Sequence, residues 1–309
     1  MRVLFMGTPD IAVPTLETLL ASKHQVIGVV TQPDKPKGRG KAVSYPVVKE
    51  IALKHDLPVY QPAKVREEAF VEKVKELNPD VIVVIAFGQI IPKDILEIPR
   101  YGCINIHASL LPKYRGAAPI QWAVIDGEEK TGLTTMYMEE GLDTGDMLLK
   151  KEVAIAPDET GGSLHDKLAS LGGELILETL EKAENGTLVR IKQDDAQSNY
   201  AKMLSKTMGH IDFSKPAIEI ERLIRGLNPW PSAYTSLDGK TLKIWNVDVL
   251  EEEREGEVGE IIEVTKHSVI VKTGMGALTL KEVQLEGKKR MDIEAFLRGY
   301  EIHTGTILK

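Results

Sequence analysis

The chain has few cysteine and aromatic residues. Its 309 residues include one cysteine, Cys103, and only 5% aromatic residues. A single cysteine excludes an intramolecular disulfide and is typical of a reducing compartment, so we expect a cytoplasmic protein. Cys103 lies among apolar residues of an expected strand, where a cysteine is usually a small hydrophobic residue rather than a reactive thiol. The length favours two domains.

Long hydrophobic runs and an excess of positive charge are also missing. No apolar stretch approaches the ~20 residues that a membrane helix needs, so we expect no membrane partner. The charged Arg2 leads straight into a strand-like run, and we expect no targeting segment. The formal net charge of -7 gives no global attraction to nucleic acid. A nucleic-acid partner would therefore require a local cluster of positive side chains.

Strands and helices alternate in the first third of the sequence. Residues 81–86 are apolar at every position, which is expected of a parallel strand covered on both faces. Segments with helical periodicity separate this run from the other strand-like runs. The alternation predicts an α/β fold with an open, mostly parallel, Rossmann-like sheet. The strands expected in this sheet cover residues 3–6, 26–31, 81–86 and 103–106.

The sequence pattern changes after Trp122. Two more strands are expected at 133–138 and 148–155, and then a helix that ends near Asn185 and Gly186. Another helix is expected to begin with Ser214 as its N-cap. The short strands that follow predict a small, OB-like β-barrel. They cover residues 241–250, 258–264, 268–273 and 277–285.

These patterns predict two domains. The first covers residues 1–187 and the second, the barrel, covers 209–309. Residues 188–208 show no strong period and are expected to form a linker between them.

The densest signal for chemistry lies at the end of the strand over 103–106. Asn105 and His107 are two residues apart, so in a strand both side chains point to the same face. A hydrogen-bonded polar pair in the core is the plain alternative. We favour a functional role because a loop rich in Pro and Gly follows, and ligands bind beyond the carboxyl ends of strands in open α/β sheets.

This residue pair has a specific chemical capacity. An Asn amide can donate to an oxygen that gains negative charge during acyl transfer, and a His can exchange a proton near neutral pH. A nearby carboxylate would raise the pKa of the imidazole, and Asp143 and Asp146 are the candidates. A turn in which the aspartates cap their own backbone is the alternative, and it suits Asp146 better. No nucleophile elbow or metal-ligand cluster is present, so we expect the attacking group to belong to a substrate and expect no metal.

Several motifs identify a family. The run Asn-Ile-His-Ala-Ser-Leu-Leu-Pro over 105–112, with Arg-Gly-Ala-Ala-Pro over 115–119 and Gly-Leu-Asp-Thr-Gly-Asp over 141–146, resembles the 10-formyltetrahydrofolate-dependent formyltransferases. Flanking motifs extend the resemblance over nearly the whole chain. Phe87, where the family pattern has Tyr, is a small departure.

The resemblance implies a role for each matching position. Asn105 would stabilise the oxyanion, His107 would manage the proton, and Asp143 would hold and tune His107. The co-substrate would be 10-formyltetrahydrofolate, and its pterin ring would lie against Ser109, Leu110, Leu111 and Pro112. The acceptor implied is the α-amine of methionine on initiator tRNA, in support of translation initiation, with the barrel as a tRNA-binding domain.

A basic loop offers the local positive charge that a tRNA partner requires. Four positive side chains stand in seven residues, at Lys35, Lys37, Arg39 and Lys41. A solvated surface loop is the plain alternative. The resemblance implies that this loop grips the acceptor end of initiator tRNA. A second patch, 288–290, lies in the expected barrel, and we leave its contact with tRNA open.

Other functions fit less of the sequence. A formyltransferase for an amino-sugar nucleotide would share the main signature but gives no reason for the basic loop. A single-domain formyltransferase for glycinamide ribonucleotide leaves residues 206–309 unexplained. An NAD-dependent dehydrogenase would need a glycine fingerprint that Gly7-Thr-Pro does not supply. A non-catalytic RNA-binding module gives no reason for Asn105, His107 and Asp143. Nothing demands an oligomer, and we expect a monomer.

Overall fold

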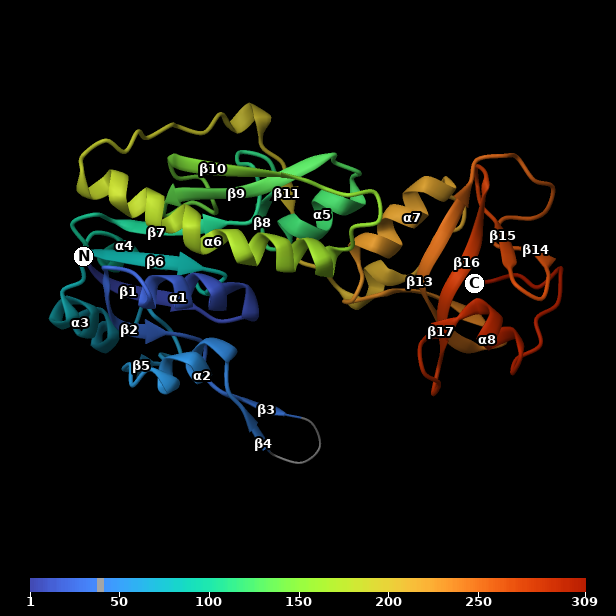
Figure 1. The fold of residues 1–309 in the computed structure, drawn as a ribbon, viewed down its shortest axis with the longest axis horizontal. Coiled ribbons are helices and arrows are strands. Elements are labelled where there is room, and N and C mark those ends of the chain that lie inside the picture. Colours follow the sequence, from blue (N-terminus) through green and yellow to red (C-terminus); the bar gives the residue numbers. More distant parts are fainter. Residues whose placement is uncertain (38–41) are drawn as a thin grey trace. The chain divides into compact units, whose positions relative to one another are not determined.

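The computed structural model describes residues 1–37 and 42–309, which divide into two compact units (Figure 1). Unit 1 comprises residues 1–119, 131–153 and 165–201. Unit 2 comprises residues 120–130, 154–164 and 202–309. Within the described residues, no helix is long and apolar enough to cross a membrane.

Unit 1 is built on a seven-stranded sheet with the order β10-β9-β7-β6-β1-β2-β5. Strands β5, β2, β1, β6 and β7 pair in parallel, and β9 pairs antiparallel with β7. This confirms the mostly parallel, Rossmann-like sheet. The strands are β1 (Arg2–Gly7), β2 (Gln25–Val30), β5 (Val59–Tyr60), β6 (Val81–Ile85), β7 (Cys103–His107), β9 (Lys130–Tyr137) and β10 (Met147–Ala154).

The helices of unit 1 bury apolar stripes against this sheet. Helix α6 runs from Gly161 to Glu184 and ends before Asn185 and Gly186, as the helix-stop signal predicts. The remaining helices connect the parallel strands. They are η1 (Asp10–Ala12), α1 (Val13–Leu20), α2 (Val47–Lys54), α3 (Glu68–Leu77) and α4 (Lys93–Leu96).

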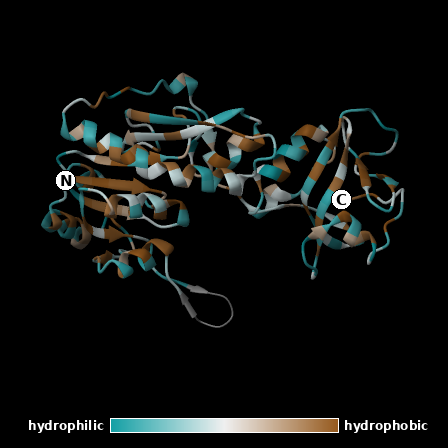
Figure 2. Cartoon of the chain, viewed as in Figure 1, coloured by the Kyte–Doolittle hydropathy of each residue, from teal (hydrophilic) through white to brown (hydrophobic). Residues whose placement is uncertain are grey.

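The core of unit 1 follows from the apolar strands. All five residues of β6 are buried, and Figure 2 shows this strand as hydrophobic along its length. Cys103 packs in the same core, and burial raises the pKa of its thiol to about 12. A thiol with that pKa carries almost no thiolate near neutral pH, so Cys103 acts as a core residue.

The basic loop is flanked by a short hairpin. Strand β3 (Lys35–Lys37) pairs antiparallel with β4 (Ala42–Ser44), with Lys35 opposite Ser44. The sequence pattern does not predict these strands. Residues 38–41 lie outside the described part of the chain, and with them the expected tRNA contacts Arg39 and Lys41.

The segment expected to be a linker carries structure of its own. Ile191 forms a bridge with Met147, and β11 (Tyr200–Ala201) pairs in parallel with β8 (Arg115–Gly116). Two short 3-10 turns, η3 (Asp195–Gln197) and η4 (Lys206–Gly209), interrupt it. Residues 191–201 therefore lie along unit 1, although 188–208 has no helical or strand period in the sequence.

Unit 2 contains an antiparallel sheet with the order β12-β13-β16-β15-β14, and β17 pairs with β16. Its strands are β12 (Ala233–Leu237), β13 (Lys240–Leu250), β14 (Ile261–Val264), β15 (Val269–Lys272), β16 (Ala277–Leu285) and β17 (Met291–Asp292). Its helices are α5 (Pro119–Ile125), which begins at the unit boundary, α7 (Ala217–Gly226) and α8 (Ile293–Leu297).

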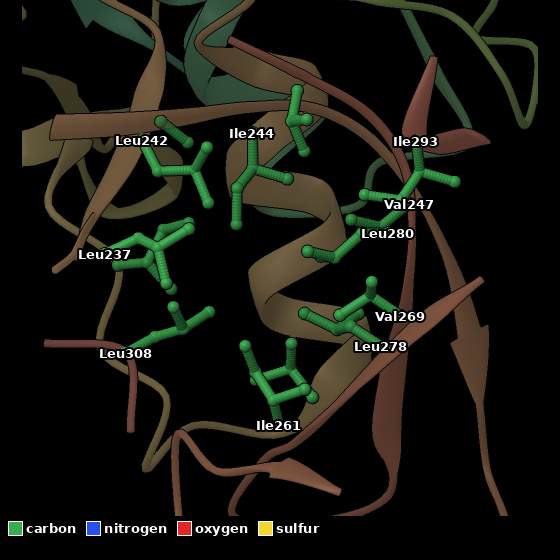
Figure 3. Packing of buried hydrophobic residues seen from close by; sticks show 14 of the residues in the cluster. Leu237, Leu242, Ile244, Val247, Ile261, Val269, Leu278, Leu280, Ile293 and Leu308 are labelled. Atoms are coloured by element: carbon green, nitrogen blue, oxygen red, sulfur yellow. The ribbon is translucent and has the colours of Figure 1, made fainter. Parts of the chain in front are cut away.

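The C-terminal residues close this sheet into a barrel. Lys309 exchanges backbone hydrogen bonds with Ser236 of β12, and Thr306 accepts one from Ile261 of β14. Leu308 packs into the barrel core beside Leu237 and Ile261 (Figure 3). The predicted C-terminal domain of short antiparallel strands is thus present, and its C-terminal residues link β12 to β14 by backbone hydrogen bonds that the sequence pattern did not indicate.

Candidate active site

Asn105 and His107 lie at the carboxyl end of β7. The strand is flanked by β6 and β9, which pair Asn105 with Val84 on one side and Met136 on the other. Because side chains alternate along a strand, Asn105 and His107 share a face of the sheet. Both are nearly buried, with 9% and 6% of their surfaces exposed. Two polar side chains at this depth need hydrogen-bond partners.

The loop after β7 fixes the proton of His107 on one ring nitrogen. Nε2 of His107 lies 2.8 Å from the carbonyl oxygen of Tyr114. A carbonyl oxygen can only accept, so Nε2 must donate and carries its proton whether the ring is neutral or charged. The nitrogen that is left to gain or lose a proton is Nδ1. That nitrogen lies 3.7 Å from Oδ2 of Asp143.

Asp143 is held at this position by the backbone of β8. Its Oδ2 accepts a hydrogen bond from the Gly116 N–H at 2.8 Å. Asp146, the other candidate, instead forms an ion pair with Arg190 at 2.9 Å. Of the two aspartates, Asp143 is therefore the one beside His107.

The amide of Asn105 is available for a ligand. Within residues 1–37 and 42–309, no side chain or backbone group forms a hydrogen bond with it. Its polar atoms are not fully enclosed, since among the described residues the Thr15 hydroxyl is the one fully buried side-chain polar atom without a partner. The amide can therefore meet an oxygen of a bound substrate.

The four residues expected to line the folate site divide into two pairs. Ser109 and Leu111 are fully buried and hold the loop in place. The Ser109 hydroxyl donates to the Lys113 carbonyl at 2.6 Å, and the Leu111 side chain packs with a small core cluster on β9 and β10. Leu110 and Pro112 are only partly buried, so these two have side-chain surface for a ligand.

Three residues that shape the site were not predicted from the sequence. Tyr114 and Gly116 act through backbone groups, which leave no mark on residue identity. Gln193 is a buried side chain from the expected linker, and its amide donates to the carbonyl oxygens of Asp143 and Gly145. A polar residue with long-range partners in a segment without periodicity carries no local signal.

The charged patches are placed as follows. Lys35 is exposed at the base of the β3–β4 hairpin, and Lys37 lies in β3. In the second patch, Arg290 stacks over the Trp245 ring at 4.6 Å and also pairs with Glu282. Part of the positive charge at 288–290 is therefore neutralised by a neighbour.

Comparisons with known proteins agree on the family. The formyl transferase family matches residues 1–180, and the formyl transferase C-terminal domain matches residues 203–301. The methionyl-tRNA formyltransferase of Agathobacter rectalis is 58% identical over 306 residues, which is 99% of each chain. That of Clostridioides difficile is 54% identical over 308 residues, covering 100% of both.

Solved structures share the fold at much lower identity. A sugar 3N-formyltransferase, determined with dTDP and 5-N-formyl-tetrahydrofolate, has a TM-score of 0.68 at 20% identity over 94% of this chain and 99% of its own. An N-formyltransferase from Helicobacter canadensis, in complex with folinic acid and dTDP-3-aminofucose, has a TM-score of 0.68 at 21% identity over 91% and 99%.

Proposed function

Since the chain belongs to the methionyl-tRNA formyltransferases, we propose that it transfers a formyl group from 10-formyltetrahydrofolate to the α-amine of methionine on initiator tRNA. The observation that carries the proposal is the site on β7. An unpaired amide and an imidazole share one face of the strand, and a carboxylate lies 3.7 Å from the free ring nitrogen. This set suits transfer of an acyl group to an amine.

Asn105 supplies the electrostatic part of the reaction. When an amine attacks a formyl carbon, the carbonyl oxygen gains negative charge. The Asn105 side-chain N–H donates to that oxygen and is already oriented by β7, so little reorganisation is needed as the charge develops. Donors of this kind contribute about 10²- to 10³-fold to turnover.

His107 moves the proton. The attacking amine loses a proton as the new C–N bond forms, and the nitrogen of the folate gains one as the old C–N bond breaks. Nδ1 of His107 is suited to this exchange, since Nε2 is engaged by Tyr114. Asp143 stabilises the ring while it is positively charged, and the Gly116 N–H keeps the carboxylate in place.

The residues after β7 fit a folate co-substrate. Leu110 and Pro112 present partly exposed apolar surface, while the buried Ser109 and Leu111 fix the loop that carries them. The flat pterin ring would lie on that apolar surface. When bound, the folate supplies an activated formyl group, and this chain supplies its orientation.

The basic loop fits a tRNA acceptor. Lys35 and Lys37 lie on β3, which pairs with β4, and Arg39 and Lys41 follow in the sequence. Positive side chains gathered within seven residues can contact several phosphates of a nucleic acid. An amino-sugar nucleotide, with two phosphates at most, would not need four such side chains.

A competition between acceptors tests the proposal. Purified protein is given 10-formyltetrahydrofolate with methionyl initiator tRNA, or with a dTDP-linked amino sugar, and formylation is followed by mass spectrometry. We expect formyl-methionyl-tRNA and no formylated sugar. Elongator methionyl-tRNA is the matched control, since it carries the same amine on a different tRNA. Formylation of the sugar nucleotide alone would contradict the proposal and favour the alternative acceptor.

A further inference from the structure

A buried glutamine joins the two loops of the site. Gln193 exposes 7% of its surface. Its Nε2 donates to the carbonyl oxygens of Asp143 and Gly145, at 2.8 Å each, and its Oε1 accepts from Nε of Arg115 at 3.0 Å. The amide N–H groups of this side chain therefore bond to the loop of Asp143, and its carbonyl oxygen bonds to Arg115 in the loop that follows β7.

The loop of Asp143 needs such support. Asp143 has a φ of 53°, in the left-handed region that residues with a side chain seldom occupy. A residue persists in that region only where its surroundings hold it. The carbonyl of Asp143 belongs to the same peptide backbone that aims its carboxylate, so a hydrogen bond to that carbonyl limits where Oδ2 can lie.

Residues 199–201 also hold the Gly116 N–H in place, and this group is the hydrogen-bond donor to the Asp143 carboxylate. Arg115 N–H donates to the Asn199 carbonyl at 3.0 Å, and Ala117 N–H donates to the Ala201 carbonyl at 2.9 Å. These bonds to β11 leave the intervening Gly116 N–H facing away from β11, where it donates to Oδ2 of Asp143. Asn199 and Ala201 thus fix the donor of this bond, and Gln193 fixes the loop of its acceptor.

We infer that Gln193 is a positioning residue for the reaction, which keeps the Asp143 carboxylate beside Nδ1 of His107. Among the described residues its hydrogen bonds go to Arg115 and to the backbone of residues 143–145, and none goes to His107 or Asn105. The inference rests on the proposed function, because it takes Asp143 to act on His107 during formyl transfer. It assigns to Gln193, which lies in the segment expected to link two domains, a part in catalysis.

Hydrogen exchange tests the geometry without turnover. The substitution Gln193→Met keeps the length of the side chain and removes its two donors. We expect exchange at the Gly116 amide, followed by mass spectrometry of peptides that contain it, to be about tenfold faster or more in this variant. Asp194→Ala is the matched control: it removes the side-chain cap of η3 in the same segment and no bond to the Asp143 loop. Equal protection of Gly116 in wild type and Gln193→Met would overturn the inference.

A double-mutant cycle tests the catalytic part. In the wild-type background, Gln193→Met should lower kcat about 10- to 100-fold, as small misplacements of catalytic groups do, with little change in the KM of either substrate. In an Asp143→Ala background the same substitution should cost less than about threefold, since the group it positions is gone. Asp194→Ala should leave kcat unchanged in both backgrounds.

The possible failures are distinguishable. If wild-type protein does not formylate methionyl-tRNA, the proposed function fails while the exchange measurement still stands. If wild-type protein is active and Gln193→Met costs the same factor in both backgrounds, the side chain supports the fold in general and the positioning role is wrong. Retention of full kcat in Gln193→Met would show that the side chain only fills space.

Discussion

The His107 ring is oriented by a backbone carbonyl rather than by another side chain. The Tyr114 carbonyl accepts from Nε2, and this leaves Nδ1 toward Asp143. The side chain proposed to transfer the proton is thereby kept in one tautomer by a backbone group. Substitution of the Tyr114 side chain would leave this bond in place, so residue identity at 114 says little about its part in the site.

Removal of the imidazole tests its role. For His107→Ala we expect kcat to fall by about 10²- to 10⁴-fold, the usual contribution of a general acid or base, while the KM for tRNA changes little. Steady-state formylation and tRNA binding by filter assay measure the two effects. His55→Ala, at an exposed position after α2, is the control. Turnover within about threefold of wild type would exclude proton transfer by His107.

A second histidine, His24, is expected to make the free energy of unfolding depend on pH. His24 is 6% exposed, and burial lowers its pKa below 6.5, with the positive N-terminus 3.4 Å away adding to the effect. The unfolded chain therefore binds a proton near pH 6.5 that the folded chain binds only at lower pH. The free energy of unfolding should fall as the pH drops below 6.5, until the folded protein is also protonated.

Urea unfolding between roughly pH 5 and pH 7.5 measures this dependence. His24→Gln removes the titrating group, so its free energy of unfolding should depend less on pH over that window than that of wild type. His55→Ala should keep the wild-type dependence. Identical pH dependence in His24→Gln and wild type would rule out His24 as the source.

Among the elements, one of the shortest strand pairings has a large consequence for the site. Strands β8 and β11 have two residues each, yet they present the Gly116 N–H to Asp143. Gly116 has a φ of 111°, and a Cβ there would lie 2.5 Å from Cε2 of Tyr200 and 2.7 Å from the Ala201 carbonyl. The exposed Tyr200 ring can move aside, but the carbonyl belongs to the pairing itself.

The substitution Gly116→Ala should therefore separate β8 from β11 and lower kcat about tenfold or more. The matched control is Gly186→Ala. Gly186 also has a positive φ, 69°, but a Cβ there meets nothing within 4 Å. Both variants carry the backbone cost of about 1–3 kcal/mol, measurable by chemical unfolding, and only Gly116→Ala should lose turnover. Equal kcat in the two variants would contradict the proposed role of β8.

The sequence predicts a helix or strand well where its hydrophobic pattern repeats over many residues. It predicts poorly the short strands that only a few backbone hydrogen bonds define. The apolar run of β6 and the leucine stripe of α6 predict those elements to within a few residues. The hairpin β3–β4 and strand β11 have two or three residues each, too few to display a period. Ser214 was expected to cap α7; the cap position is Pro216, and the Ser214 hydroxyl bonds Asp212 instead.

The site shows the same division. Asn105 and His107 stand out because two polar residues in an apolar strand share a face. The glycines around Asp143 mark its loop as a turn, but its approach to His107 needed coordinates. Gln193 could not be found, since it donates to backbone atoms 50 and 48 residues away and accepts from the Arg115 side chain 78 residues away. The catalytic roles of these residues stay predictions until the variants are measured.

At the scale of the whole molecule, the net charge of the protein has the same sign as the charge of its proposed tRNA partner, which opposes binding. The chain has a formal charge of -7, and its proposed acceptor is a polyanion. Binding must then depend on local positive charge, and ions in solution screen charges separated by more than about 8–10 Å at physiological salt. The acidic remainder of the surface is therefore felt weakly at the hairpin, and the contacts there should dominate the dependence on salt.

Kinetics at several salt concentrations test this balance. The KM for tRNA should rise steeply with salt, and Arg39→Ala should raise it at low salt while reducing the slope of log KM against log salt by about one. The KM for the folate should not change. Lys54→Ala removes one positive charge from an exposed position on α2 and is the control. An unchanged slope in Arg39→Ala would exclude a phosphate contact by this residue.

The hydrogen bond from Gln193 to the Asp143 loop also affects the order in which contacts form during folding. The bond from Gln193 to Asp143 closes a loop of 50 residues, whereas neighbouring strands of the sheet can pair over shorter spans. Longer loops cost more entropy to close, so we expect this contact to form after the pairing of β1 with β2 and of β6 with β7, which close loops of 23 and 21 residues. A refolding chain should thus regain its circular dichroism before its activity, and for that interval it is a folded protein that is not yet an enzyme.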